Sequence, residues 1–324
     1  MKYIDLHLHL DGAITVEIAK KLAKMQNITL PGSTDQELAK LIHVSPNCKN
    51  LVEFLQCFDL PLSLLQTKEA LEEATYLVLE DMKKNNNIYV ELRYAPQLHT
   101  QQKMNQEDAI KAVLRGLKRS SLKANIILCL MRGEDNDEAN LETVELAKKY
   151  LVSDGGVVAL DLAGAESLYP TQKYQQIFAK IKANHIPFTI HTGESEEPSG
   201  VKLAVNLGAN RIGHGVRIRE DQEVLELIKE KRIPLELCPT SNIQTCAVSS
   251  YEDHPLVDYL HQGIKVTINT DDPAIENTSI SNEFALMEKY HNLTKEEIKE
   301  ILLNSIDAAF TTEEVKQELR QEIK

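Results

Sequence analysis

The chain has 324 residues, of which 42% are hydrophobic, so it is long enough for one large domain or two ordinary ones. Its 36 basic and 49 acidic residues give a net charge of −13, which argues against DNA or RNA as a partner, because nucleic-acid binding needs a basic surface. Five scattered cysteines without C-x-x-C spacing indicate neither a disulfide framework nor a thiolate zinc site.

The chain opens with a segment that is predicted to be a strand, YIDLHLHLDGA (3–13). Side chains alternate between the two faces of a strand, so His7 and His9 share one face and the neighbouring leucines share the other. Asp11 and Gly12 end the strand and leave both imidazoles at its C-terminal end. The two histidines are therefore a candidate pair of metal ligands, and two surface histidines on an edge strand are the alternative. Further ligands elsewhere in the chain decide between these interpretations.

The position of this strand also bears on localisation. Because it begins at residue 3, there is no room for the basic and apolar regions of a signal peptide. No later apolar run approaches the length that crosses a membrane. With cysteines that suit a reducing compartment, we expect a cytoplasmic protein without membrane contact.

A helical insertion is predicted after the first strand, over about residues 14–87. Apolar residues recur at helical spacing in three segments, which are Ile14–Met25, Leu51–Leu65 and Ala70–Met82. The second segment carries an apolar stripe at i, i+3, i+4 and i+7, formed by Leu51, Phe54, Leu55 and Phe58. Such a stripe is either ordinary core or a lid that lines a pocket.

Beyond the insertion, short β-rich segments alternate with helical ones. Seven further strands are predicted, at Ile88–Ala95, Ile126–Met131, Val157–Ala163, Pro187–His191, Arg211–His214, Pro234–Cys238 and Lys265–Thr270. The helical segments between them include Gln106–Lys118, Leu141–Tyr150, Gln172–Asn184, Glu220–Lys231 and Pro255–Gln262. Eight repeats of strand and helix without a linker predict an α/β protein with a single domain over residues 1–324, a (β/α)8 TIM barrel. Extra helices at the C-terminal end follow, with capping boxes at Thr294 to Glu297 and Thr311 to Glu314.

Candidate functional residues lie where the predicted strands end, and barrel enzymes carry their chemistry at that rim. The fifth strand ends in HTGE (191–194), the sixth in GHG (213–215) and the eighth in NTDDP (269–273). Taken singly, a strand-end histidine is more often a packing residue, and Asp-Asp-Pro is a common turn. Their coincidence at one rim with the first two histidines indicates a metal site. Three imidazoles and one carboxylate suit zinc or iron(II) and leave a position for water, which predicts hydrolytic chemistry.

With these motifs the sequence resembles the adenosine deaminases, a family within the amidohydrolase superfamily of metal-dependent barrels. The resemblance covers essentially the whole chain. The segments that carry it are HLHLDGA (7–13), FLQCFD (54–59), YVELRYAP (89–96), LDLAGAE (160–166), HTGE (191–194), RIGHG (211–215), CPTSN (238–242) and NTDDP (269–273). The reaction that it implies is hydrolytic deamination of adenosine and 2′-deoxyadenosine to inosine and deoxyinosine, with release of ammonia, in purine salvage.

The resemblance also implies a metal centre and two catalytic residues. One zinc ion per chain would be held by four ligands, His7, His9, His191 and Asp271. Glu194 would protonate the purine ring nitrogen, which agrees with general chemistry because a hydroxide adds more easily to an aromatic ring that is protonated as charge builds on it. His214 would orient and deprotonate the attacking water, a role that suits the titration range of an imidazole.

Substrate contacts follow from the same resemblance. The backbone of Gly164 and the side chain of Asp272 would hold the base, although Asp272 alone could be a turn residue before Pro273. Asp11 would hold the sugar. Independently of the resemblance, we expect the stripe Leu51, Phe54, Leu55 and Phe58 to close over the bound purine nucleoside.

The chain departs from related patterns in informative places. Thr192 stands where the family commonly has alanine, beside the acid but without changing a ligand. Two-metal members of the superfamily carry a bridging lysine on the fourth strand, and Val157–Ala163 holds none, which favours one metal. The H-x-E and P-C-x-x-C signature of the unrelated cytidine-type zinc deaminases is absent from the sequence.

Several alternative functions stay open from the sequence. Within the family, the substrate could be adenine or a modified adenosine, such as a 5′-thio nucleoside or aminodeoxyfutalosine. Asp11 argues against adenine as the substrate, because adenine deaminases of this group usually carry glutamate at the matching place. A catalytically silent barrel that serves as a binding or signalling module is a further alternative. The retention of every ligand and both acid–base residues argues against it.

Overall fold

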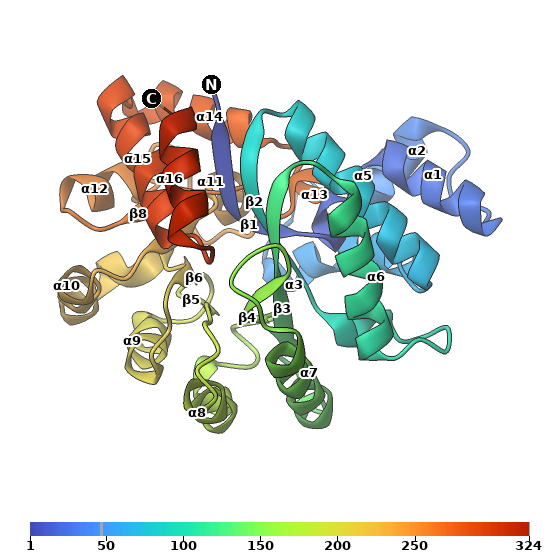
Figure 1. Cartoon of the computed structure of the whole chain (residues 1–324). Coiled ribbons are helices and arrows are strands. Elements are labelled where there is room, and N and C mark those ends of the chain that lie inside the picture. Colours follow the sequence, from blue (N-terminus) through green and yellow to red (C-terminus); the bar gives the residue numbers. More distant parts are fainter. Residues whose placement is uncertain (46–47, 324) are drawn as a thin grey trace.

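Eight parallel strands lie at the centre of the computed structural model, which describes residues 1–45 and 48–323, and helices surround them (Figure 1). The strands are β1 (Tyr3–His9), β2 (Asn87–Tyr94), β3 (Lys123–Met131), β4 (Val157–Ala163), β5 (His191–Thr192), β6 (Ile212–His214), β7 (Leu235–Leu237) and β8 (Val266–Ile268). They pair in sequence order as two four-stranded sheets, β1 to β4 and β5 to β8. Parallel bridges between Leu160 and Phe188 and between Leu8 and Asp271 join the sheets at both edges. The predicted (β/α)8 barrel is thereby confirmed.

Helices alternate with the strands as predicted. Those of the barrel are α6 (Gln106–Arg119), α7 (Asp137–Tyr150), α8 (Gln175–Ala183), α9 (Pro198–Leu207), α10 (Gln222–Lys231), α11 (Pro239–Gln244), α12 (Leu256–His261), α13 (Pro273–Glu276), α14 (Ile280–His291), α15 (Lys295–Ala308) and α16 (Glu313–Glu322). Short 3-10 helices are η1 (Asp11–Ala13), η3 (Pro96–His99), η4 (Thr171–Tyr174) and η5 (Val216–Glu220). The strands of the second sheet are shorter than predicted. Left-handed backbone at His214 and Asp271 turns the chain out of the ladder where the rim begins.

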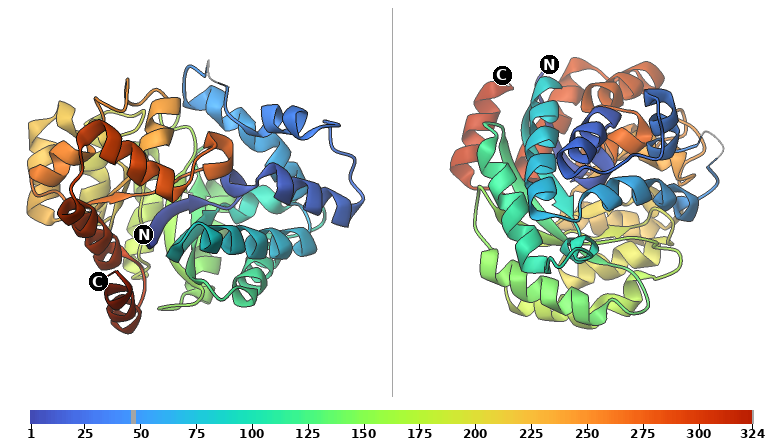
Figure 2. Two further views of the ribbon diagram at one scale, coloured as in Figure 1. Left: turned by 90° about the horizontal axis from the view of Figure 1, so that it is seen from above. Right: turned by 90° about the vertical axis from the view of Figure 1, so that its right-hand side faces the viewer.

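The predicted insertion consists of helices gathered at one end of the molecule, opposite the C-terminal helices (Figure 2). They are α1 (Val16–Gln26), α2 (Asp35–Ile42), α3 (Leu51–Phe54), η2 (Leu55–Phe58), α4 (Asp59–Leu64) and α5 (Lys68–Lys84). The single helix predicted over Leu51–Leu65 is thus divided into three short elements. Pro61, which lacks an N–H group, fits the first turn of α4.

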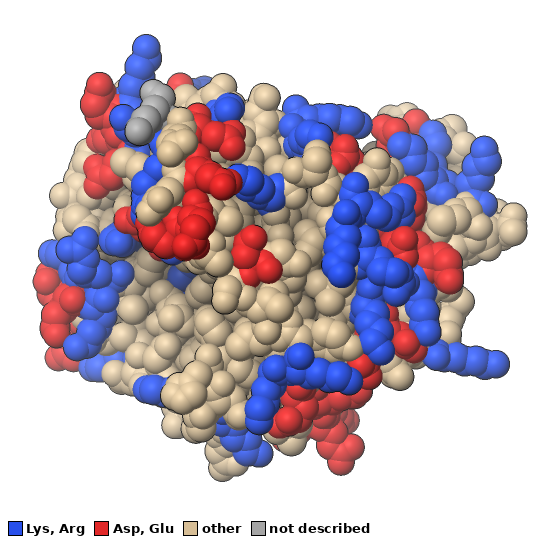
Figure 3. Space-filling view, in the orientation of Figure 1, with Lys and Arg blue, Asp and Glu red and all other residues tan. Residues whose placement is uncertain are grey.

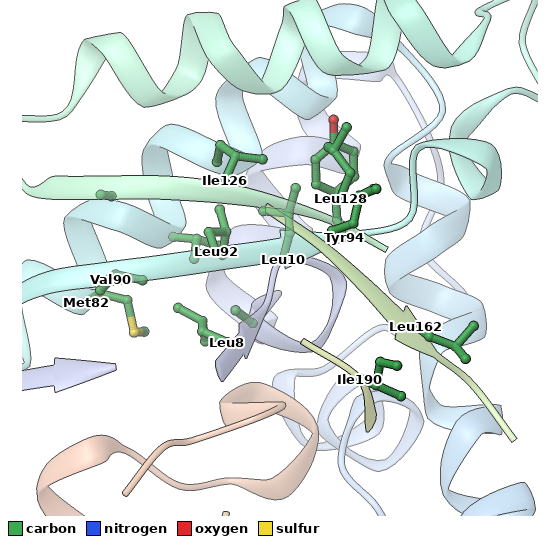
Figure 4. Close-up of a cluster of buried hydrophobic side chains, with 14 of the residues drawn as sticks. Leu8, Leu10, Met82, Val90, Leu92, Tyr94, Ile126, Leu128, Leu162 and Ile190 are labelled. Atoms are coloured by element: carbon green, nitrogen blue, oxygen red, sulfur yellow. The ribbon is translucent and has the colours of Figure 1, made fainter. Parts of the chain in front are cut away.

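The core lies between the strands and the surrounding helices. Figure 4 shows Leu8, Val90, Leu92, Ile126 and Leu128 packed together, and all five are fully buried. Because side chains alternate along a strand, the residues next to these, at positions 7, 91 and 93, face the interior of the barrel. Those at positions 91 and 93 are charged and buried.

One of the two predicted capping boxes is present, and in place of the other a single threonine cap lies one residue later. Thr294 accepts from Glu297 N and Glu297 returns a bond to the cap backbone, so the first box is confirmed. The sequence predicts the second box at Thr311, but Thr312 caps α16 by accepting from the N–H of Val315. The hydroxyl of Thr311 instead donates to Asp154 at 2.5 Å. The prediction was wrong by one residue because this long-range bond takes the first threonine.

Oppositely charged side chains lie side by side on the face shown in Figure 3. Among the ion pairs of the protein, Arg115–Glu72 and Arg119–Glu73 join α6 to α5. A mixed face of this kind differs from the clustered positive charge of a nucleic-acid-binding surface. None of the helices in the described part of the chain has both the length and the apolar composition that a membrane crossing requires.

A buried carboxyl group anchors α11, the short helix that follows β7 at the rim. Glu283 on α14 accepts from the backbone N–H of Thr240 at 2.9 Å and from the hydroxyl of Thr240 at 2.6 Å. The hydroxyl of Thr278 donates to the same carboxyl group. Burial raises the pKa of Glu283 to about 7. The folded protein therefore binds a proton here more tightly than the unfolded chain does.

This raised pKa predicts a pH-dependent loss of stability. Between about pH 4.5 and 7 the unfolded chain releases the Glu283 proton first, so the free energy of unfolding should fall as pH rises through that window. Glu283→Gln should remove this component, worth at most about 3 kcal/mol, and should gain stability relative to the wild type as pH rises toward 7. Denaturant unfolding at several pH values measures it. Glu288→Gln, an exposed change on the same helix, is the control, and equal pH profiles for all three proteins would contradict the assignment.

Candidate active site

Four side chains converge at the C-terminal end of the barrel. They are His7 and His9 of β1, His191 of β5 and Asp271, which follows β8. Nε2 of His191 lies 2.9 Å from Nε2 of His7 and 3.2 Å from Nε2 of His9. Oδ1 of Asp271 lies 3.2 Å and 3.3 Å from the same two nitrogens. The four donor atoms therefore surround one point.

This cluster fits a single metal ion. Ligand atoms about 2.0–2.1 Å from one Zn²⁺ and about 90–110° apart would lie about 2.9–3.4 Å from one another, which is the spacing found here. Imidazole and carboxylate groups are also ligands that zinc takes in catalytic sites. Burial, together with the nearby His191 and His7, holds the pKa of His9 well below its usual value. The ring is thus neutral, as a metal ligand must be.

Buried charges below the cluster orient two of its imidazoles. Nδ1 of His7 is hydrogen-bonded to Oε2 of Glu236 at 2.7 Å, and Nδ1 of His191 lies 2.9 Å from Oδ2 of Asp161 without hydrogen-bond alignment. Arg93 bridges the two carboxylates, donating to Asp161 at 2.7 Å and to Glu236 at 2.8 Å. Arg93 and both carboxylates are fully buried, so each charge depends on its partners. Carboxylates in this position hold ligating imidazoles in orientation.

His214 ends β6 and faces the cluster, with Nε2 3.7 Å from Oδ2 of Asp271. Both residues have left-handed backbone, with φ of 62° at His214 and 60° at Asp271. This conformation is strained for residues other than glycine and is concentrated at functional sites. At the rim, the strained backbone thus occurs at the two residues that face each other across the cluster.

Hydrogen bonds on the far side of the His214 ring set its tautomer. The backbone N–H of Leu256 donates to Nδ1 of His254 at 3.3 Å, which leaves Nε2 of His254 to donate to Oδ1 of Asn242 at 3.2 Å. The amide nitrogen of Asn242 then donates to Nδ1 of His214 at 3.1 Å. In this arrangement a neutral His214 carries its proton on Nε2, the atom that faces the cluster.

Glu194 lies on the loop after β5, with its carboxyl group buried beside the cluster. Oε1 accepts from the hydroxyl of Thr245 at 2.8 Å, and Oε2 lies 3.9 Å from Nε2 of His214. Burial raises the pKa of Glu194, the carboxylates of Asp271 and Glu166 raise it further, and His214 opposes them. A raised pKa favours the protonated form that a proton donor needs.

Two further carboxyl groups line the pocket with an unpartnered oxygen. Oδ1 of Asp11 and Oδ1 of Asp272 are buried and have no hydrogen-bond partner among the described residues. Burial raises the pKa of Asp11 to about 6, and burial with the neighbouring carboxylates, first that of Asp271, raises the pKa of Asp272 well above its usual value. Gly12 makes room for this pair, because a Cβ there would lie 1.7 Å from Oδ1 of Asp272. Buried polar atoms without partners are available to a polar ligand.

One pocket contains these groups, and its remaining walls are largely apolar. Those walls are formed by Leu51, Phe54, Leu55, Phe58, Leu62, Ala95, Leu98, Cys129, Met131, Ala163 and Gly164. The stripe predicted from the sequence is thus part of the wall, with Phe54 buried and Phe58 half-buried at a ring distance of 6.3 Å. The structure brings all of the predicted site residues together at this pocket and its floor.

The residues that support the site from below were not predicted from the sequence. Glu236 stands between two leucines of β7, and Asp161 stands between two leucines of β4. A charged residue inside a strand that is otherwise apolar and buried must find a charged partner, and this was the available signal. Arg93 on β2 is the partner of both. Asn242 lies in the CPTSN motif (238–242) but was given no role there, and His254 gave no comparable signal.

Comparisons with known proteins agree with this geometry. A family model described as "Adenosine deaminase" matches residues 3–324. An adenosine deaminase of Haemophilus ducreyi is 48% identical over 98% of this chain and 94% of its own length. The crystal structure of an adenine deaminase from Arthrobacter aurescens superposes with a TM-score of 0.89 at 27% identity, covering 99% of this chain and 97% of that one. An N6-methyl-AMP deaminase from Arabidopsis thaliana superposes with a TM-score of 0.84 at 30% identity, covering 100% and 96%. A barrel with this pocket, matched over nearly its full length by both sequence and structure, belongs to the adenosine deaminase family.

Proposed function

We propose that this chain hydrolyses adenosine and 2′-deoxyadenosine to inosine and deoxyinosine, with release of ammonia. The observation that carries the proposal is one pocket that combines a four-donor metal cluster, a buried carboxyl group with a raised pKa and a facing imidazole. The 48% identity to an adenosine deaminase over nearly the whole chain supports the same reaction. A silent barrel would be expected to have lost at least one of these groups. We also infer a reducing compartment such as the cytoplasm, because all five cysteines are free thiols.

One zinc ion per chain would be held by His7, His9, His191 and Asp271, whose donor atoms have the required spacing. When bound, such an ion supplies Lewis acidity and makes water a better nucleophile near neutral pH. The protein contributes the orientation of the His7 imidazole through its hydrogen bond to Glu236, and the Asp161 carboxylate lies 2.9 Å from Nδ1 of His191.

Glu194 would donate a proton to the purine ring nitrogen next to the carbon that is attacked. Addition of water to that carbon places negative charge on the ring nitrogen, and a protonated carboxyl group beside it lowers the barrier. His214 would orient the attacking water by donation from Nε2, the tautomer that Asn242 favours. Removal of the water's proton, which the family resemblance also assigns to His214, would need the opposite tautomer.

Asp272 and the backbone of Gly164 would hold the base, and Asp11 would hold the sugar. Asp272 in its protonated form can donate to an acceptor nitrogen of the purine, since its Oδ1 has no other partner. Asp11 lies two residues beyond the ligand His9, so the metal cluster sets where its carboxyl group emerges. The wall formed by Leu51, Phe54, Leu55 and Phe58 would exclude water from the bound nucleoside.

The related proteins of known structure include an adenine deaminase and an N6-methyl-AMP deaminase. A free base and a nucleotide are therefore two other substrate classes to compare with a nucleoside. A nucleotide is disfavoured because no lysine or arginine occurs among the described residues that line the pocket, whereas the carboxyl group of Asp11 lines it at the proposed sugar position. Adenine is disfavoured because it leaves Asp11 unpartnered in a buried site. A modified adenosine with an apolar 5′ substituent stays compatible with the apolar wall.

A substrate panel tests the function directly. The purified protein is incubated with adenosine, 2′-deoxyadenosine, adenine, a 5′-thio nucleoside, aminodeoxyfutalosine and AMP, and ultraviolet difference absorbance follows loss of the exocyclic amine. Adenosine and 2′-deoxyadenosine should react far faster than adenine or AMP. Preference for adenine, or no reaction with any purine nucleoside, would refute the proposal.

Asp11→Ala should lower kcat/KM for adenosine and spare the weak activity on adenine. The lost bond from a ribose hydroxyl to a carboxylate is worth about 1.5–3 kcal/mol, or roughly ten- to more than a hundred-fold. Asp11→Glu, which keeps the charge but lengthens the side chain into the sugar position, should also favour adenine. Both variants are assayed with both substrates in the ultraviolet assay. Equal losses on adenosine and adenine would show that Asp11 does not contact the sugar.

A further inference from the structure

A buried carboxylate holds the loop that carries Glu194. Glu166 lies three residues after the end of β4 and is 1% exposed. Its Oε1 accepts from the backbone N–H of Gly193 at 2.5 Å, and its Oε2 accepts from the N–H groups of Glu194 and Ser195 at 3.1 Å and 2.7 Å. The hydroxyl of Ser195 adds a fourth contact at 3.3 Å. Three successive backbone N–H groups therefore point at one side chain.

This arrangement needs a special backbone. Gly193 has φ of 73°, in the left-handed region, which turns its N–H and the next ones toward the same side of the loop. A side chain at this position would also meet a methyl group of Val201 at 2.6 Å and the backbone of Gly215 at 3.2 Å. The loop is thus shaped so that its amides surround the Glu166 carboxylate.

The charge of Glu166 has no direct counter-ion. No ion pair joins it to a cation in residues 1–45 and 48–323, and Arg132 and Arg217 act on it only from a longer distance. A buried carboxylate is costly unless hydrogen bonds to it are well aligned. A neutral or apolar residue would cost less if filling space were its only purpose. The contacts therefore indicate a role in holding these particular amides.

The two loops joined in this way carry two parts of the purine pocket. Gly164, two residues before Glu166, lies in the pocket wall on the loop after β4. Glu194 lies in the same pocket on the loop after β5. Glu166 is the side chain that connects the backbone of one loop to the backbone of the acid itself. Its length sets how far the acid stands from the Gly164 wall.

We propose that Glu166 is a positioning residue, which holds Glu194 at the correct distance from the base bound against Gly164. The inference rests on the proposed function, because it assigns Glu194 as the proton donor to a purine. In this proposal Glu166 acts only through Glu194. Removing the Glu166 carboxylate should therefore matter only while Glu194 can donate a proton.

A double-mutant cycle tests this claim. Glu166→Gln places an amide N–H₂ group against backbone donors and should lower kcat by about 10- to 100-fold, with a much smaller change in KM and with metal content unchanged. In the Glu194→Gln background, the same substitution should lower kcat by less than about three-fold, because the effects of coupled residues are not additive. Glu166→Asp, which keeps the charge but is shorter, should fall between the wild type and Glu166→Gln. Amide hydrogen exchange at residues 193–195 should be faster in both single Glu166 variants.

The control is Glu197→Gln, which removes an exposed carboxylate from the same loop and should stay within about two-fold of the wild type. Equal losses from Glu166→Gln in the two backgrounds, or loss of metal in that variant, would overturn the proposal in favour of general support of the site. If Glu166→Gln does not fold, the cycle is completed with Glu166→Asp, and the same two outcomes decide it. The cycle is measured on whichever purine the wild type converts, so failure with adenosine refutes the proposed substrate and leaves this test intact.

Discussion

Asp271→Ala should remove metal and activity together. Oδ1 of Asp271 lies within 3.3 Å of the Nε2 atoms of both His7 and His9, so the substitution deletes one of four converging donors. Loss of residues that only support a ligand typically costs 10- to 100-fold in metal affinity, and loss of the ligand itself should cost more than about 100-fold. Elemental analysis should find about one zinc per wild-type chain and far less in the variant.

Asp258→Ala is the matched control, because Asp258 is an exposed aspartate on α12, outside the pocket. It should keep the metal content and turnover of the wild type. Treatment of the wild type with a chelator should abolish activity, and added zinc should restore it. Two metal ions per wild-type chain, or full activity of the metal-free protein, would refute the mononuclear site.

Glu194→Gln should leave the metal in place and lower kcat by about 10²- to 10⁴-fold, the usual contribution of a general acid. Glutamine keeps the size of the side chain and can still accept from the hydroxyl of Thr245, but it cannot donate a carboxylic proton. Glu194 is not one of the four converging donors, so zinc should remain at about one per chain. Turnover of adenosine and elemental analysis are measured on the same sample.

The raised pKa of Glu194 also predicts how kcat depends on pH. Burial and the carboxylates of Asp271 and Glu166 favour its protonated form, so the wild type should keep an active acid at a higher pH than an exposed glutamate could. Wild-type kcat should fall as pH rises through that pKa, and the Glu194→Gln variant should lack this fall. A zinc-loaded variant with near-normal turnover would return Glu194 to the status of a rim carboxylate.

Buried charges below the site decide whether the Asp271→Ala and Glu194→Gln substitutions affect chemistry or folding. Arg93, Glu236 and Asp161 compensate one another, and Arg211 continues the network to Glu236 at 2.5 Å and to Glu91 at 2.6 Å. Removing one member would leave a buried charge without a partner, which destabilises the fold as well as the site. Asp271 and Glu194 lie outside these arginine pairs. Their substitution should therefore report on chemistry rather than on folding.

Local sequence determined much of the barrel fold and of the candidate site. Alternation of period two placed His7 and His9 on one face of β1, and repeated alternation of strands and helices predicted the barrel. The chain direction of parallel strands then placed the ends of β5, β6 and β8 at one rim, which grouped His191, His214 and Asp271 before any distance was known. The capping box at Thr294 was predicted correctly because all of its partners lie within four residues.

What only the tertiary structure decided involves partners far apart in the chain. The bond from Glu236 to His7 spans 229 residues, and the bonds from Glu166 to the loop of Glu194 span 27 to 29. The bond from Thr311 to Asp154 and the space that Gly12 leaves for Asp272 also depend on residues brought together from elsewhere. Local periodicity records which face of an element is buried, but it does not record what lies against that face. Closure of the barrel sets those neighbours, so the candidate ligands could be predicted from the sequence, whereas the charges and amides next to them could not.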